Sequence, residues 1–166
     1  MSDMYREIMI QKKTPMIKKL LKGMLPVLTV LFLFAGMVMP LLLIGAVAFG
    51  LATFFLAPKL EVEYEYLYVN GELDIDAIYS RQKRKKVGSY DVAELEILAP
   101  SNSHALDSYL NGKNASVKDY TSGDPQVKSY ILIYNKDKGQ EMIKVELDDV
   151  ILNDMRRMAP RKVNLM

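Results

Sequence analysis

The sequence predicts a membrane-anchored α+β protein, in which an N-terminal transmembrane helical hairpin precedes a small antiparallel β sandwich or barrel that ends in a helix. Three patterns predict this class. Residues 23–58 contain no ionisable side chain, the residues after Lys59 alternate between apolar and polar, and an amphipathic segment lies near the C-terminus. With 166 residues, of which 25% are charged, the chain has room for one compact domain besides the apolar stretch.

The apolar stretch is too long for one membrane crossing. A bilayer core about 30 Å thick needs roughly 20 helical residues, and tilt does not absorb an excess of this size comfortably. Two crossings need about 40 residues, which are available if the first helix starts upstream and Lys18, Lys19 and Lys22 extend to the headgroups. Such a hairpin spans residues 15–58, while a single long tilted helix remains the alternative.

Local signals place the two helices of this hairpin. Thr14 and Pro15 are typical of a helix start. Residues 36–40 (GMVMP) supply a glycine that ends one helix and a proline that opens the next. We therefore expect helices at about 15–38 and 40–57. In the second helix, Gly45, Ala48 and Ala52 share one face, which predicts close packing against the first helix or, alternatively, against a membrane protein partner.

Charge predicts the orientation in the membrane. Six basic residues precede the apolar stretch, and Lys59 and the run at 81–86 follow it. Because positive flanks stay on the cytoplasmic side, we expect a multi-pass protein of a bacterial cell membrane with both termini in the cytoplasm. Residues 1–14 are then a cytoplasmic N-terminal segment and residues 60–166 a cytoplasmic β domain. No charge lies mid-membrane, which argues against transport.

Periodicity predicts the strands of the β domain. Alternation predicts strands at 61–69 and 72–79, joined by the Asn70-Gly71 hairpin turn, and further strands at 87–92 and 94–98. Residues 101–109 have the caps of one or two helical turns. A turn at 111–114, a short strand at 115–120, a hairpin of strands 127–134 and 140–147 around 135–139, and an amphipathic helix at 148–158 complete the chain. About seven strands in sequential hairpins form a sandwich or partly open barrel.

The order of these elements resembles the pleckstrin-homology-type fold. The segments KKTP, YEYLYVNGELDIDAI, RQKRKK, LAPSNSHALDSY and MAPRKV, arranged around a paired hydrophobic stretch, also resemble a family of small two-helix membrane proteins from anaerobic Gram-positive bacteria. The similarity covers nearly the whole chain. It implies the same architecture and a bacterial membrane location, and it carries over no activity and no catalytic residue.

The run RQKRKK is the main candidate site. Its basic residues would feel the negative potential of the cytoplasmic leaflet, which is worth about 1 kcal/mol for each residue near the surface. A solvated hairpin loop that only sets topology is the competing interpretation. Nucleic acid is disfavoured, because residues 59–166 hold 16 basic and 18 acidic residues and no aromatic residue interrupts the run. The five basic residues are Arg81, Lys83, Arg84, Lys85 and Lys86.

Composition disfavours an enzyme. Without cysteine there is no disulfide, thiol nucleophile or Cys-bound metal, and we expect neither a metal nor a cofactor. His104 lies three residues before Asp107 among several serines, but local capping explains this cluster better than a catalytic triad does. The acid pairs at 74–76 and 148–149 lack the spacing of a calcium loop. The sequon at 114–116 would not meet the glycosylation machinery in the cytoplasm.

The sequence thus predicts a non-enzymatic integral membrane protein. Its cytoplasmic domain would bind a protein partner or anionic lipid headgroups at the membrane surface. The alternative is a small subunit or assembly factor of a larger membrane complex, which would dock through the face of Gly45, Ala48 and Ala52.

Overall fold

The computed structural model describes residues 4–110, 117–136 and 139–165. The chain forms two compact units. The hairpin unit consists of Lys12–Glu63 and Ile78–Arg84, and the domain unit consists of Met1–Gln11, Tyr64–Ala77 and Lys85–Met166.

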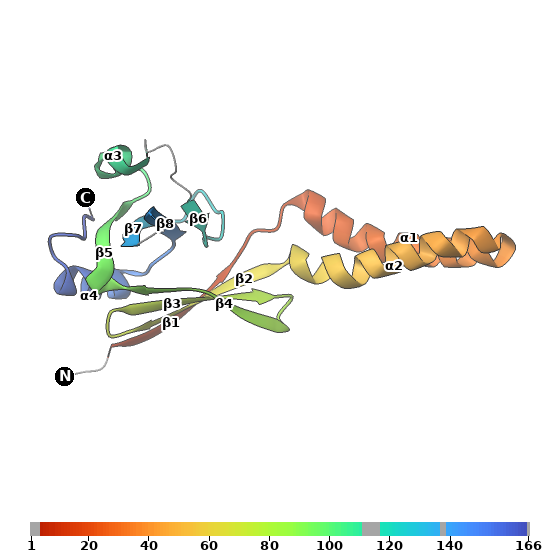
Figure 1. Cartoon of the computed structure of the whole chain (residues 1–166), viewed down its shortest axis with the longest axis horizontal. Helices are drawn as coiled ribbons and strands as arrows, with labels where there is room; N and C mark the ends of the chain where they lie inside the picture. The colour runs from red at the N-terminus through yellow and green to blue at the C-terminus, as the bar shows by residue number, and fades with distance from the viewer. Residues whose placement is uncertain (1–3, 111–116, 137–138, 166) are drawn as a thin grey trace. The chain divides into compact units, whose positions relative to one another are not determined.

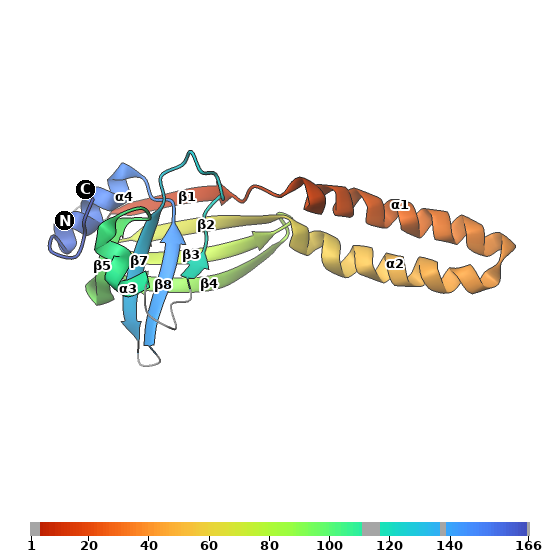
Figure 2. The ribbon, with the colours of Figure 1, turned by 90° about the horizontal axis from the view of Figure 1, so that it is seen from above.

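Two apolar helices, α1 (Met16–Val38) and α2 (Leu43–Leu56), dominate the hairpin unit and run side by side (Figures 1 and 2). Short 3-10 helices, η1 (Pro40–Leu42) and η2 (Ala57–Leu60), precede and follow α2. Only Met39 breaks the helical backbone between α1 and η1, with φ −125° and ψ 99°. The break rules out a single long tilted helix. The helices lie close to the expected ranges 15–38 and 40–57, but Gly36 lies inside α1 and no side chain caps the start of α1.

The contact between the two helices uses small and threonine side chains. A side chain at Gly45 would overlap the ring of Phe32, so the glycine allows close approach. The hydroxyls of Thr29 and Thr53 lie 3.4 Å apart across the interface, and each is hydrogen-bonded to a carbonyl four residues earlier in its own helix. Both hydroxyls therefore have a hydrogen-bond partner within the protein. This is the condition for placing a polar group in lipid, where no water is available.

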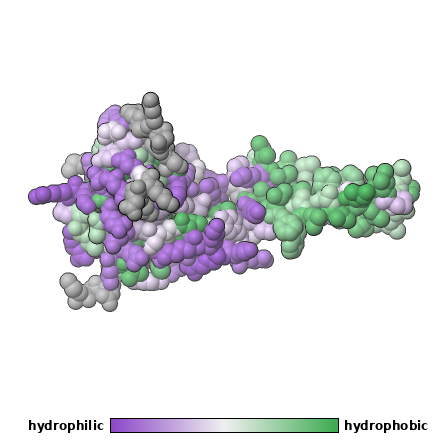
Figure 3. Space-filling model, in the orientation of Figure 1, coloured by the Kyte–Doolittle hydropathy of each residue, from purple (hydrophilic) through white to green (hydrophobic). Residues whose placement is uncertain are grey.

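Most of the other side chains of α1 and α2 are apolar and exposed (Figure 3). The spans Met16–Val38 and Pro40–Leu60 are long and apolar enough to cross a membrane, and only 11% and 6% of their most apolar windows are buried. A core helix of a water-soluble protein would be mostly buried. The two helices are therefore suited to a membrane environment.

The first sheet has the strand order β1-β2-β3-β4. Asn70 and Gly71 both have positive φ, 47° and 97°, and form the predicted turn between β2 and β3. The predicted alternation is confirmed where it forms the core, since Tyr66, Tyr68, Leu73 and Ile75 are fully buried. The strands are β1 (Tyr5–Gln11), β2 (Val62–Val69), β3 (Glu72–Tyr79) and β4 (Lys83–Asp91).

Strand β1 was not predicted from the sequence, which gave residues 1–14 only as a segment before the membrane. The Asn70 amide donates to the Met4 carbonyl at 3.0 Å, and the Lys12 amide donates to the Val62 carbonyl at 3.2 Å. Residue numbers rise along one strand as they fall along the other, so β1 and β2 run antiparallel. The helical hairpin is therefore inserted between two neighbouring strands of one sheet.

The second sheet has the order β5-β7-β8-β6. Strands β7 and β8 form the predicted hairpin, although β7 begins at Tyr130 and not at residue 127. Strand β6 pairs with β8 in parallel, so the prediction of purely sequential hairpins was wrong here. The predicted turn at 111–114, the first residues of the predicted strand at 115–120 and the centre of the turn at 135–139 lie outside the described residues. The strands are β5 (Leu95–Pro100), β6 (Val117–Asp119), β7 (Tyr130–Lys136) and β8 (Gly139–Val145).

Short helices complete the domain unit. The Asp148 side chain caps α4 (Asp149–Met158) by accepting from the Ile151 amide at 2.9 Å, one residue inside the predicted start. One face of α4 joins residues of both sheets in the main core, as expected for a pleckstrin-homology-like domain. The predicted turns at 101–109 are η4 (His104–Leu106) and α3 (Asp107–Leu110), and η3 (Val92–Glu94) links β4 to β5.

Candidate functional site

The sequence predicted a loop at residues 81–86. In the structure, most of this basic run belongs to a strand. Only Ser80, Arg81 and Gln82 form the turn between β3 and β4. Residues 83–86 begin β4, which is an edge strand of the first sheet. Pairing with β3 outweighs the low strand propensity of lysine, and charged side chains on an edge strand also oppose pairing with other chains. All the residues from 81 to 86 are exposed.

The turn of this run is bonded to the segment that follows the helical hairpin. The Ser80 hydroxyl donates to the Pro58 carbonyl at 3.0 Å, and the Ser80 amide donates to the Glu61 carbonyl at 3.1 Å. The Arg81 guanidinium donates to the Glu63 carboxylate at 3.1 Å. Since Pro58 is the last residue of the uncharged stretch, these bonds hold the basic turn beside the base of the hairpin.

The other basic residues of the hairpin unit lie just before α1, in its first two turns, or just after α2. Lys22 pairs with Glu61 at 2.7 Å. The hairpin unit contains nine basic and two acidic residues, a formal charge of +7, whereas the domain unit contains thirteen basic and eighteen acidic residues, a formal charge of −5. The nine basic residues are Lys12, Lys13, Lys18, Lys19, Lys22, Lys59, Arg81, Lys83 and Arg84.

The last residue of the run has a different environment from the first. The Lys86 ammonium lies 2.7 Å from the Asp74 carboxylate of β3, which also accepts from the Ser89 hydroxyl. Burial raises the pKa of Asp74, but the hydrogen bonds from Lys86 and Ser89 outweigh it and leave this pKa lowered. The hydrogen bond to Asp74 raises the pKa of Lys86. Lys86 therefore remains charged and partly neutralised by its partner.

The structure places the three small residues of α2 in different environments. Gly45 packs against Phe32 of α1, Ala52 is half-buried, and Ala48 is exposed. The face of α2 toward α1 also includes Ala46, which is buried, and Gly50, which lies near Thr29.

The remaining candidate residues lie apart from this site. His104 and Asp107 pair at 3.2 Å with side chains 99% and 64% exposed, and Ser103 caps η4 by accepting from the Ala105 amide. Asp148 caps α4 and pairs with Arg6 at 2.7 Å. Among the described residues, no three His, Asp or Glu side chains are arranged to hold a metal ion.

Two hollows lie on the domain unit. One, of about 310 Å³, lies between η3 and the end of α4, and Arg161 and Lys162 are its ionisable side chains. The other, of about 460 Å³, is lined by residues 100–102, 125–130 and Leu165. Neither hollow contains a carboxylate or the histidine, so neither provides a general base of the usual kind.

Sequence reasoning found the basic run but missed what holds it in place. The bonds from Ser80 to Pro58 and Glu61 join segments about twenty residues apart, and no local pattern marks them. The apolar alternation Ile8, Ile10 in residues 5–11 was the available signal for β1.

Comparison with known proteins gives one family. A family model described as bacterial PH-like domain (DUF6106) matches residues 2–165, nearly the whole chain. No curated protein and no solved structure matches the sequence.

Proposed function

Because this chain belongs to the bacterial PH-like domain family, we propose that it is a non-enzymatic membrane protein that binds anionic lipid headgroups at the cytoplasmic surface. The helical hairpin is the permanent anchor, and the basic residues beside its base make the electrostatic contact. The observation that carries this proposal is the bonding of the basic turn to Pro58 and Glu61.

The insertion of the hairpin between β1 and β2 supports an anchor whose two legs enter and leave the membrane on the same side. Neighbouring strands lie about 4.8 Å apart, and the Lys12 amide is bonded to the Val62 carbonyl. The two ends of the hairpin must therefore lie on the same side of a bilayer whose core is about 30 Å thick. An excess of Lys and Arg on that side supports a cytoplasmic location for it, and therefore for both termini.

The distance of the basic turn from the membrane surface decides whether its charge contributes to lipid binding. The surface potential of an anionic leaflet falls off within a Debye length, about 8 Å at physiological ionic strength. Ser80 is bonded to the carbonyl of Pro58, where the apolar stretch ends. With the hairpin inserted, Arg81 and its neighbours lie within this range, whereas Lys128, Arg161 and Lys162 of the domain unit have no such tether.

The proposal is tested by following the turn itself in the full chain, because a fragment starting at residue 60 would lack β1. The chain has no cysteine, so Gln82→Cys gives a single attachment point for a polarity-sensitive fluorophore. In nanodiscs, we expect a blue shift when phosphatidylglycerol replaces part of the phosphatidylcholine, and its reversal at high salt. Replacing the five basic residues by Gln should abolish the shift, since each contributes about 1 kcal/mol near the surface.

The matched control replaces basic residues of the domain unit that lie outside the run at 81–86. Replacing Lys128, Arg161 and Lys162 by Gln should leave the shift unchanged. A fluorophore that gives the same spectrum in both lipid mixtures would refute headgroup binding. If, in addition, a membrane protein co-purifies in stoichiometric amount after gentle extraction, the basic surface binds a protein partner and the chain is a subunit of a larger complex.

A further inference from the structure

The tip of the hairpin has no polar side chain. The turn from Gly36 to Leu43 reads GMVMPLLL, and Met37, Val38 and Leu41 are 76%, 84% and 74% exposed. Turns that enter water are rich in Asn, Asp, Ser and Gly, whose side chains or backbones are easily hydrated. Exposing apolar surface to water is unfavourable, so the tip is poorly suited to an aqueous phase.

The length of the legs leads to the same conclusion. The ion pair of Lys22 with Glu61 marks the base of the hairpin, where charged groups must be near headgroups and water. From Gly23 to Val38 at 1.5 Å per residue, α1 extends about 24 Å beyond this base. The hydrocarbon core is about 30 Å thick. The tip therefore does not pass the far boundary of the core.

The backbone of the tip is compatible with this depth. The Met39 amide donates to the Ala35 carbonyl at 3.0 Å, and the Leu42 amide donates to the Met39 carbonyl at 2.9 Å. Pro40 has no N–H, and the Leu43 amide is bonded within η1. A side chain at Gly36 would overlap the Leu43 side chain, so the glycine allows the chain to reverse closely here. Few donors at the turn thus need water, which is the condition for a reversal in lipid.

We propose that the hairpin enters from the cytoplasmic side and ends in the acyl chains of the far leaflet, so that residues 36–43 never reach the opposite aqueous phase. This inference depends on the membrane anchor of the proposed function. The partner of the tip is the lipid interior, and the protein presents no surface on the far side.

Site-directed spin labelling of the full chain in liposomes tests the depth of the tip. Single cysteines replace Val38 at the tip, Leu31 in the middle of α1 as the lipid reference, and Ser108 in α3 as the water reference. Leu31 is 56% exposed and Ser108 is also exposed, so both accept a label. We expect Val38→Cys to match Leu31→Cys, with frequent collisions with oxygen and several-fold fewer collisions with a water-soluble nickel chelate than Ser108→Cys.

Two other results overturn different claims. If the label at residue 38 meets the chelate as often as the label at 108, while the label at 31 stays protected, the tip emerges and this inference is wrong. If the labels at 31 and 38 are both accessible to the chelate, the hairpin is not in the bilayer and the proposed anchor is wrong as well.

Discussion

The two units of this chain treat apolar and charged residues in opposite ways. The domain unit buries its large apolar side chains in a core shared by two sheets and α4 and has a formal charge of −5. The hairpin unit exposes most of its apolar side chains and has a formal charge of +7. The small net charge of +2 therefore hides two regions adapted to different surroundings, and only the hairpin unit is suited to an anionic surface.

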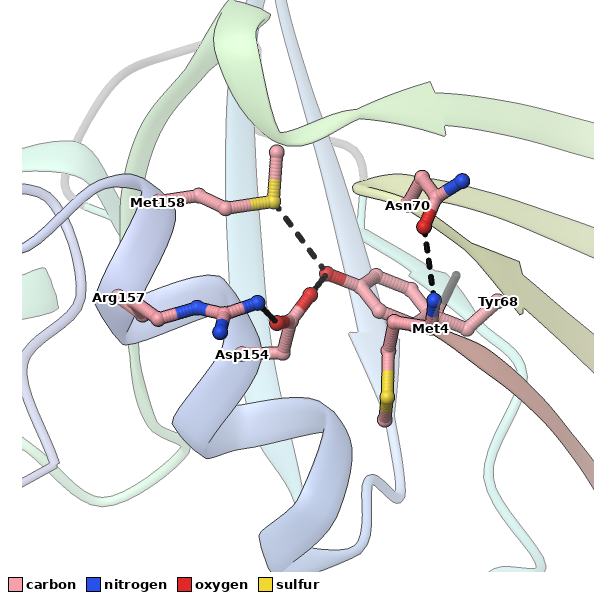
Figure 4. A network of polar contacts seen from close by, with 6 residues as sticks. All are labelled: Met4, Tyr68, Asn70, Asp154, Arg157 and Met158. Atoms are coloured by element: carbon pink, nitrogen blue, oxygen red, sulfur yellow. Dashed lines mark hydrogen bonds and ion pairs between the residues drawn. The ribbon is translucent and has the colours of Figure 1, made fainter. Parts of the chain in front are cut away.

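The units also differ in how they pair polar groups away from water. In the hairpin, Thr29 and Thr53 rely on carbonyls of their own helices. In the domain, Tyr68 donates to Asp154 of α4 at 2.8 Å, and Asp154 also pairs with Arg157 (Figure 4). Burial and this acceptor raise the pKa of Tyr68. Tyr68 of the domain thus depends on an acceptor far away in the sequence, whereas the two threonines of the hairpin depend on local acceptors.

The strongest test of this comparison removes the same side chain from each unit. Leu132 is fully buried in β7, whereas Leu31 of α1 is 56% exposed. Leu132→Ala should destabilise the domain by about 2–5 kcal/mol, and Leu31→Ala should have no measurable effect on it. Urea unfolding in mild detergent, followed by tyrosine near-UV circular dichroism, measures this, because no tyrosine lies in the apolar stretch. Equal losses would show that the hairpin shares the core.

A smaller effect is expected for the buried polar pair of the domain. Asp154→Ala leaves the Tyr68 hydroxyl buried without its acceptor and should cost about 1–3 kcal/mol. After Tyr68→Phe, the same Asp154 change should cost less, and this double-mutant cycle isolates the pair. Thr53→Val is the counterpart in the hairpin, with an expected cost of about 0.6 kcal/mol. Additive losses at residues 68 and 154 would contradict the coupling.

The smallest effect concerns the ion pair between β3 and β4. Because the pKa of Asp74 is lowered in the folded state, its stabilising contribution is present above the unfolded value of about 3.9. That contribution is lost as pH falls through the lower folded value. The Asp74→Asn variant should therefore lose slightly less stability on acidification than the unsubstituted chain does. Urea unfolding at a series of acidic pH values measures it, with Lys128→Gln as the control that should leave the pH profile unchanged.

Sequence patterns predicted the elements whose signals are local. The break at Met39 before Pro40, the Asn70-Gly71 turn and the amphipathic helix α4 all depend on residues within one or two turns of each other. Strand β1 was missed, because its partner β2 follows only after the inserted hairpin. The parallel pairing of β6 with β8 was missed because β7 lies between these two strands in the sequence. In the candidate site, the residue types were predictable, but the strand that holds residues 83–86 and the bonds of Ser80 were not.

The place of the hairpin within the sheet also constrains how the chain is made. The ribosome completes β1 before either leg of the hairpin and β2 only after both. The first strand must therefore wait, without its neighbour, until the second leg has been synthesised. In the proposed topology, insertion of one leg in the wrong direction would leave β2 on the other side of the bilayer from β1, and the two strands could not pair. Strand β1 therefore pairs with β2 only in molecules whose helical hairpin has been inserted correctly.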